Sequence, residues 1–163
     1  LGIHGIGSSK RSDFQDARAY GATILSARQI RAMGAQKVLE QLPQVTLWQT
    51  YPSAKFSFRM TDAEKQAAAE WYTAQFRKIA ETVQHGAYAM LVLDELLSCI
   101  TCGFLPEQLV LDFLENRPEA LEVVITGRDP SAALLERADY VTEMTLRKHP
   151  YEKGISARKG IEY

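Results

Sequence analysis

The sequence predicts an α/β fold, with a mostly parallel sheet covered by helices on both faces. Short apolar runs rich in β-branched residues alternate with longer helical patterns, the order that parallel strands and their crossover helices require. Two runs, residues 91–93 and 123–125, are apolar without alternation, as expected of central strands buried on both faces. The chain has 163 residues, enough for one well-buried core, so we expect a single domain over residues 1–163.

We expect five strands and a possible short sixth at residues 1–4. Each strand is a run of four to seven residues with apolar or β-branched side chains, bounded by polar or glycine-containing segments. The five are residues 22–26, 45–50, 89–94, 121–126 and 140–146. Residues 51–59 and 149–163 fit no regular pattern, so they are candidate functional loops.

Three helices are expected between these strands. The clearest begins at Thr61, because Thr61 and Glu64 have the spacing of a capping box, and it ends at Gly86. A second begins with Pro106 at its first helical position, and a third begins at Pro130. These helices lie between predicted strands, as crossover connections must.

The composition limits the kind of protein. Hydrophobic residues make up 46% and charged residues 24%, and the formal net charge is -1, which is typical of a globular chain without a nucleic-acid partner. No apolar run approaches the roughly 20 residues of a membrane span, and no signal peptide is apparent. The two cysteines are too few to crosslink a secreted fold. We therefore expect a cytoplasmic protein with no membrane partner.

An acidic pair, Asp94 and Glu95, follows the apolar run at residues 91–93. Ligands of open parallel sheets bind at the carboxyl ends of the strands, and carboxylates there can hold Mg²⁺ on a nucleotide phosphate. Any strand that leaves a core also meets polar residues, so a surface role for the two acids remains open.

A glycine-rich segment near the N-terminus, residues 5–12, has the sequence GIGSSKRS. Lysine and a hydroxyl follow glycines in the order of a phosphate-binding loop. However, Ser9 stands where that pattern has glycine directly before the lysine, and Arg11 follows Lys10. A terminal segment that is merely rich in glycine and serine is the alternative.

Basic residues occur at two further places. Arg128 follows the expected strand at residues 121–126 and precedes a helix, a turn that suits an anion, although such an arginine can also be a surface residue. The C-terminal tail carries a basic run that could close over an anionic ligand or could be a solvated terminus. That run comprises Lys148, His149, Lys153, Arg158 and Lys159.

Cys99 and Cys102 form a C-x-x-C pair, which invites a metal or redox interpretation. A structural zinc site needs four ligands, and the sequence has no second cysteine pair. Two small thiols three residues apart on a helix explain the pattern at least as well.

Five ordered motifs stand out in the second half of the chain: GAYAMLVLDEL at residues 86–96, RPEALEVVITGR at 117–128, ADYVTEM at 138–144, KHPY at 148–151 and GISARKGIEY at 154–163. Together they resemble the motifs of the cob(I)alamin adenosyltransferases of the CobA/BtuR type. The resemblance extends over residues 34–163 and is poor over residues 1–33. It implies a P-loop (RecA-like) fold and transfer of the 5′-deoxyadenosyl group of ATP to the cobalt of a reduced corrinoid, with release of triphosphate.

The resemblance also implies roles for particular residues. Phe56 and Phe58 would face the corrinoid and keep an axial ligand off the cobalt, although alternating phenylalanines could instead form a short strand over the core. The implied nucleotide-binding residues are Gly5, Gly7, Lys10, Ser12, Arg128, Arg158 and Lys159, and the implied ligands of Mg²⁺ or Mn²⁺ are Glu95, Asp94 and Ser12.

The implied substrates are ATP and cob(I)alamin or cobinamide, with a reductase or flavodoxin as a possible electron donor and a possible homodimer. Two alternatives remain. One is a catalytically impaired family member that binds corrinoid or nucleotide as a carrier or sensor, because the glycine-rich segment departs from the family pattern. The other is a thiol redox protein that uses Cys99 and Cys102.

Overall fold

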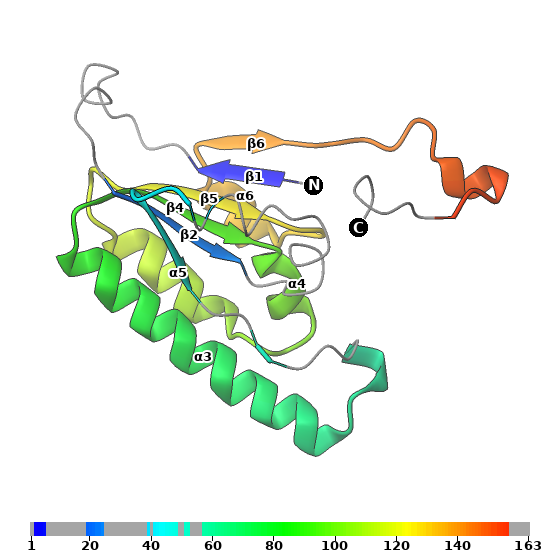
Figure 1. The fold of residues 1–163 in the computed structure, drawn as a ribbon, viewed down its shortest axis with the longest axis horizontal. Helices are drawn as coiled ribbons and strands as arrows, with labels where there is room; N and C mark the ends of the chain where they lie inside the picture. Colours follow the sequence, from blue (N-terminus) through cyan, green and yellow to red (C-terminus); the bar gives the residue numbers. More distant parts are fainter. Residues whose placement is uncertain are drawn as a thin grey trace.

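A computed structural model describes residues 2–5, 19–24, 39, 41–48, 51–52 and 57–156, and of residues 2–5 and 19–24 only the backbone. Its strands form a six-stranded sheet in the order β3-β2-β4-β5-β1-β6, and the long helix α3 crosses one side of that sheet (Figure 1). The α/β class predicted from the sequence is therefore confirmed.

Four neighbouring strands of the sheet run parallel. They are β3 (Val45–Trp48), β2 (Ala19–Ile24), β4 (Tyr88–Asp94) and β5 (Glu122–Thr126). In the register of this group, Asp94 is opposite Ile24, and Leu93 is opposite Ile125. The carboxyl ends of β2, β4 and β5 consequently meet at one edge of the sheet.

The short strand β1 (Gly2–Gly5) runs against this direction. It lies between β5 and β6 (Tyr140–Thr142) and pairs antiparallel with both. Gly2 is opposite Thr126 and Gly5 is opposite Val123. The sheet is therefore mostly parallel, as predicted, but the chain leaves β1 at the amino ends of the parallel strands.

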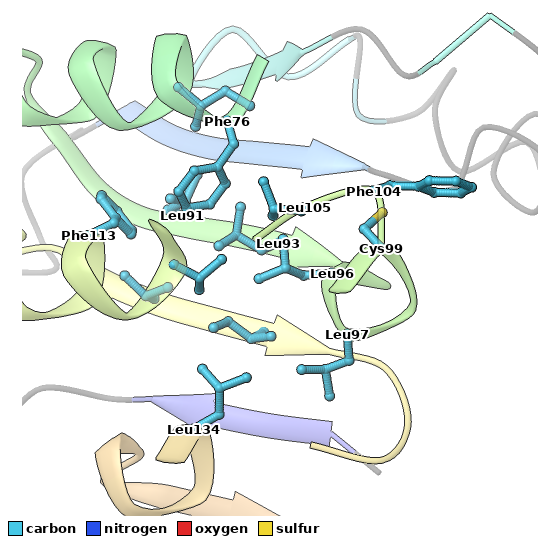
Figure 2. Close-up of a cluster of buried hydrophobic side chains, with 14 of the residues drawn as sticks. Phe76, Leu91, Leu93, Leu96, Leu97, Cys99, Phe104, Leu105, Phe113 and Leu134 are labelled. Carbon is cyan, nitrogen blue, oxygen red and sulfur yellow. The ribbon is translucent and has the colours of Figure 1, made fainter. Parts of the chain in front are cut away.

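The hydrophobic core lies on one face of β4 and β5. Leu91, Leu93, Val123 and Ile125 point into it and are buried, whereas Val92 and Val124 are only half-buried. Four helices contribute buried side chains to the same core, as Figure 2 shows: α3 (Asp62–His85), α4 (Leu96–Thr101), α5 (Glu107–Asn116) and α6 (Ala132–Arg137). Coverage of the opposite face by helices stays a prediction.

Helix α3 begins as the sequence predicts. The Thr61 backbone amide donates to Glu64 Oε2 over 2.8 Å, and the Glu64 amide donates to Thr61 Oγ1 over 3.3 Å, which completes the capping box. The buried side chains Phe76, Ile79 and Val83 recur at spacings of three and four residues, so one stripe of the helix packs on the sheet.

Two other helix starts differ slightly from the prediction. Pro106 is the N-cap of α5, not its first helical residue. Helix α6 begins at Ala132, two residues beyond Pro130, because the Ser131 hydroxyl accepts a hydrogen bond from the Leu134 amide over 3.2 Å and caps it.

The last strand is shorter than expected, since β6 ends at Thr142. The chain then continues away from the sheet (Figure 1), through the 3₁₀ turn η3 (Pro150–Lys153), and every described residue from 139 to 156 is exposed. Within the part of the chain that the structure describes, no helix is both long and apolar enough to cross a membrane.

Candidate functional site

The two predicted acids lie where β4 passes into α4. Asp94 is the last residue of β4 and Glu95 is the N-cap of α4, and both are half-buried. Glu95 has φ 56° and ψ 25°, in the left-handed region that few residues other than glycine adopt. Backbone conformations of this kind concentrate at functional sites, where the surrounding structure holds them in place.

A threonine on the neighbouring strand connects the two acids. The Thr126 hydroxyl donates to Asp94 Oδ1 over 2.7 Å and accepts from the Glu95 backbone amide over 2.9 Å. The Ser98 hydroxyl, one turn into α4, donates to Glu95 Oε2 over 2.7 Å. Each carboxylate therefore has an oxygen held by a hydroxyl group, which orients both acids at the edge of the sheet.

The sequence prediction missed Thr126 and Ser98. The signal for Thr126 was present, because it ends the strand that we expected to be parallel to the one ending in Asp94. Ser98 lies three residues after Glu95, a spacing that brings two side chains together on a helix. This spacing is too common in sequences to identify Ser98 as a site residue.

The turn after β5 packs closely on α4. Gly127 has φ 140°, and a Cβ atom there would lie 2.6 Å from Leu97 Cβ, so no larger residue fits. Arg128 follows and is exposed, two residues from Thr126. The fold thus places Arg128 at the same edge as the acids, as the sequence predicted, while its role as an anion ligand stays a prediction.

The acidic pair suits a divalent cation bound together with phosphates. Among the described residues, no group of three or more His, Cys, Asp or Glu side chains could hold a metal ion. Mg²⁺ usually takes only one or two carboxylates from the protein, and substrate phosphates and water complete its octahedron. Asp94 and Glu95 meet that requirement. Ser12, the third predicted ligand, lies outside the described residues.

The glycine-rich segment is only partly described. Gly7, Lys10 and Ser12 lie outside the described residues. Gly5 ends β1 opposite Val123, whereas Thr126, which bonds to Asp94, is opposite Gly2 at the other end of that strand. The structure therefore does not bring Gly5 to the acidic pair.

Of the two predicted corrinoid-facing rings, Phe56 lies outside the described residues. Phe58 belongs to the 3₁₀ turn η2 (Ser57–Arg59), and its side chain is 75% exposed. The Arg59 guanidinium lies 5.7 Å from the centroid of its ring. The alternative, a short strand packed over the core, is therefore wrong for Phe58.

An aromatic cluster joins α3 to the segments that follow β3 and α4, and it was not predicted as part of a site. Tyr51, which follows β3, contacts Trp71 and Tyr72 of α3 with ring centroids 5.5 and 5.7 Å apart, and Tyr72 stacks on Phe104 at 5.8 Å. Phe104 follows α4, so these four rings connect the segment after β3 to the segment after α4, the helix whose N-cap is Glu95.

The cysteine pair has the properties of a structural feature. Cys99 is buried in α4, and burial, assisted by neighbouring Cys102 and Glu95, raises the pKa of its thiol to about 12. A thiol with so high a pKa remains protonated and unreactive near neutral pH. Cys102 is exposed, and both thiols are free. This environment does not support a redox function for the pair.

The basic tail is described only as far as residue 156, so Arg158 and Lys159 lie outside the described residues. Lys148 and Lys153 are exposed. His149 has a local structural role, since its Nδ1 accepts a hydrogen bond from the Tyr151 amide over 3.1 Å and caps η3.

These features define an α/β protein with a parallel four-stranded group and a hydroxyl-bridged acidic pair at the carboxyl ends of β4 and β5. The chain belongs to the family of ATP:corrinoid adenosyltransferases BtuR/CobO/CobP, whose model matches residues 15–163. The match begins after the glycine-rich segment at residues 5–12, and it includes Asp94, Glu95, Thr126 and Arg128.

Individual relatives agree with this assignment. A corrinoid adenosyltransferase of Pseudomonas aeruginosa is 35% identical over 111 residues, which is 66% of this chain and 52% of the relative. One of Sinorhizobium sp. is 37% identical over 89 residues (54% and 42%), and the corrinoid adenosyltransferase CobA of Salmonella typhimurium is 39% identical over 74 residues (45% and 38%). The chain thus spans about half the length, or less, of these curated relatives.

Proposed function

We propose that this protein transfers the 5′-deoxyadenosyl group of ATP to the cobalt of a reduced corrinoid and releases triphosphate. The observation that carries the proposal is the acidic pair, Asp94 and Glu95, which the Thr126 hydroxyl holds at the carboxyl edge of a parallel sheet in a chain of this family. Open α/β sheets bind their ligands at this edge.

The reaction needs little acid–base chemistry from the protein. Cobalt(I) of the corrinoid substrate is itself the nucleophile: a cobalt–carbon bond forms to C5′, the C5′–oxygen bond breaks, and its electron pair leaves with the triphosphate. The protein must align the two substrates and stabilise the charge of the leaving group. A bound Mg²⁺ would neutralise part of that charge. Asp94 and Glu95 would hold the ion, and Arg128 would contact the phosphates from the next strand.

The corrinoid would bind beside the turn that carries Phe58. The Phe58 side chain is 75% exposed and could contact an apolar macrocycle, and Phe56 would act with it. A reductase or flavodoxin would have to supply the electrons, because the nucleophile exists only in the reduced state. A cytoplasmic location belongs to the same proposal, and the two free cysteines support it.

The P-loop (RecA-like) assignment of the fold is also part of the proposal. The parallel order β3-β2-β4-β5 with two acids after β4 supports it. The glycine-rich segment departs from that assignment, since Gly5 lies at the amino ends of the parallel strands. Lys10→Ala tests it: loss of ATP binding would support a phosphate-binding role for the segment that contains Gly7, Lys10 and Ser12, and unchanged binding would argue against that role.

Anoxic turnover with the purified chain tests the function. With ATP, Mg²⁺ and chemically reduced cob(I)alamin, we expect a light-sensitive adenosylated corrinoid, followed by its absorbance spectrum, and an equal amount of triphosphate. The double variant Asp94→Asn, Glu95→Gln keeps the size of both side chains and should lose most of the turnover rate. Binding of ATP and corrinoid without product would instead favour a carrier or sensor, and absence of binding would contradict both.

A further inference from the structure

The Thr126 hydroxyl occupies a position from which it controls both acids. It has one proton, which it donates to Asp94 Oδ1 over 2.7 Å, and it accepts the Glu95 amide proton over 2.9 Å. Its two partners are Asp94, the last residue of β4, and Glu95, the residue that follows it. Thr126 itself belongs to β5, more than 30 residues further along the chain. The bridge therefore fixes the end of one strand relative to the end of the next.

From this geometry we infer that Thr126 is a positioning residue for a complex of a divalent cation with a nucleoside triphosphate. The inference rests on the proposed function for the identity of the ligand. Thr126 sets the direction of the Asp94 carboxylate, and by holding the Glu95 amide it stabilises the left-handed backbone from which the Glu95 side chain leaves. Metal ligands depend on such supporting hydrogen bonds for their orientation.

The packing around Thr126 supports a fixed position for its hydroxyl. Gly127 follows it with φ 140°, and the turn lies against Leu97 so closely that a Cβ at position 127 would clash at 2.6 Å. Thr126 itself is half-buried and ends a strand whose residues Val123 and Ile125 are in the core. The hydroxyl therefore has little freedom to turn away from the acids.

Ser98 supplies the matching support from the helix side. Its hydroxyl donates to Glu95 Oε2 over 2.7 Å, so the Glu95 carboxylate is held through Ser98 while its backbone is held through Thr126. Loss of the Ser98 hydroxyl would free only the Glu95 carboxylate, whereas loss of the Thr126 hydroxyl would release both the Asp94 carboxylate and the Glu95 backbone. We therefore expect a larger effect from Thr126 than from Ser98.

Thr126→Val tests the inference, because valine replaces the hydroxyl by a methyl group with little change of shape. Binding of the Mn²⁺–ATP complex to the full chain, measured by equilibrium dialysis, should weaken by about 10- to 100-fold. Thr126→Ser keeps the hydroxyl and should bind Mn²⁺ close to the level of the unaltered protein. Ser98→Ala should fall between them.

Steady-state kinetics give a second measurement. Substitution of a residue with a purely structural role would not produce the pattern expected here. In Thr126→Val the KM for the metal–ATP complex should rise, excess Mg²⁺ should restore part of the rate, and the KM for corrinoid should stay unchanged. If Thr126→Val does not fold, Thr126→Ala, which adds no atoms, replaces it in both measurements.

The outcomes distinguish the two proposals. Unchanged Mn²⁺ binding in Thr126→Val, or an equal loss in Thr126→Ser, would overturn the role of Thr126, even if the unaltered protein turns over. Mn²⁺ and ATP binding that depends on the hydroxyl, without adenosylated product, would support Thr126 and contradict the proposed function. If the unaltered protein binds no Mn²⁺ with ATP, the role of Thr126 is wrong as well.

Discussion

The acidic edge lies at the start of α4 and the aromatic cluster includes Phe104, which follows the end of α4; different forces hold the two regions together. At the acidic edge, hydrogen bonds of 2.7 to 2.9 Å join Asp94, Glu95, Thr126 and Ser98, whose side chains are half-buried. In the cluster of Tyr51, Trp71, Tyr72 and Phe104, ring contacts of 5.2 to 5.8 Å predominate. Directional bonds give the first region its geometry, and apolar burial gives the second its stability, so changes in the two regions should have separable consequences.

The largest effect should come from Gly127→Ala, which disturbs the acidic edge through its backbone. The added Cβ meets Leu97 Cβ at 2.6 Å, and a φ of 140° is strained for alanine. Overpacking and strain together should lower the free energy of unfolding by about 3 kcal/mol. Urea unfolding measures this change, and ATP affinity should fall with it.

Gly103→Ala is the matched control for Gly127→Ala. Gly103 also has a positive φ, 72°, but no atom lies within 4 Å of the position where its Cβ would be. Only the backbone cost should remain, about 1 kcal/mol, with no change in ATP affinity. Equal losses in both variants would show that the contact with Leu97 is unimportant.

Truncation in the aromatic cluster should give the reverse pattern. Tyr72→Ala removes a ring that contacts Tyr51, Trp71 and Phe104, and should cost about 2 kcal/mol, below the roughly 3–5 kcal/mol of a fully buried ring. Mn²⁺ binding with ATP should stay unchanged. Tyr72→Phe, which keeps the ring contacts, is the control, and a loss of metal affinity in Tyr72→Ala would mean that the two regions are coupled.

Thr61→Ala provides a smaller change remote from the acidic edge. It removes the side chain that accepts the Glu64 amide at the start of α3, and should cost about 1 kcal/mol. Neither the KM for ATP nor that for corrinoid should change. A kinetic effect would show that the start of α3, which follows the turn with Phe58, is part of the site.

The smallest effect near neutral pH should come from the thiols. At pH 8 iodoacetamide should label Cys102, which is exposed, and leave Cys99 unmodified, because burial raises the pKa of Cys99 from 9.0 to about 12. Mass spectrometry of proteolytic fragments gives the result. Modification of both thiols in the folded protein would contradict the assignment of Cys99 as structural.

The same shift predicts how stability changes at high pH. Between about pH 9 and 12 the unfolded thiol loses its proton while the folded one keeps it, so the folded state binds more protons and stability falls as the pH rises. Burial also raises the pKa of Tyr72, which acts in the same direction at still higher pH. Cys99→Ala should therefore reduce, but not abolish, the decrease in urea midpoint from pH 8 to pH 10.

Much of the fold could be predicted because its signals are local. The run at residues 91–93 marks a central strand, the pair Thr61 and Glu64 marks the start of α3, and the end of the apolar run places Asp94 and Glu95 at the carboxyl end of that strand. Each of these depends on residues close together in the sequence. The structure agrees at each of these places.

The remaining features depend on contacts between distant residues. The direction of β1 is set by its pairing with β5 and β6, more than 115 residues away, and four residues with two glycines carry no signal for it. The role of Thr126 follows from the register that brings β5 beside β4. The left-handed backbone of Glu95 follows from the same bridge, so the acids could be predicted but their support could not.

The left-handed backbone of Glu95 affects which substitutions selection would favour at this position. Glycine fits φ 56° without strain, so Glu95→Gly is a change that selection for thermal stability alone would favour. This chain instead has a carboxylate side chain at that position. A library screened only for resistance to heat should therefore accumulate glycine at position 95 and lose metal affinity, whereas one screened for both properties should retain glutamate.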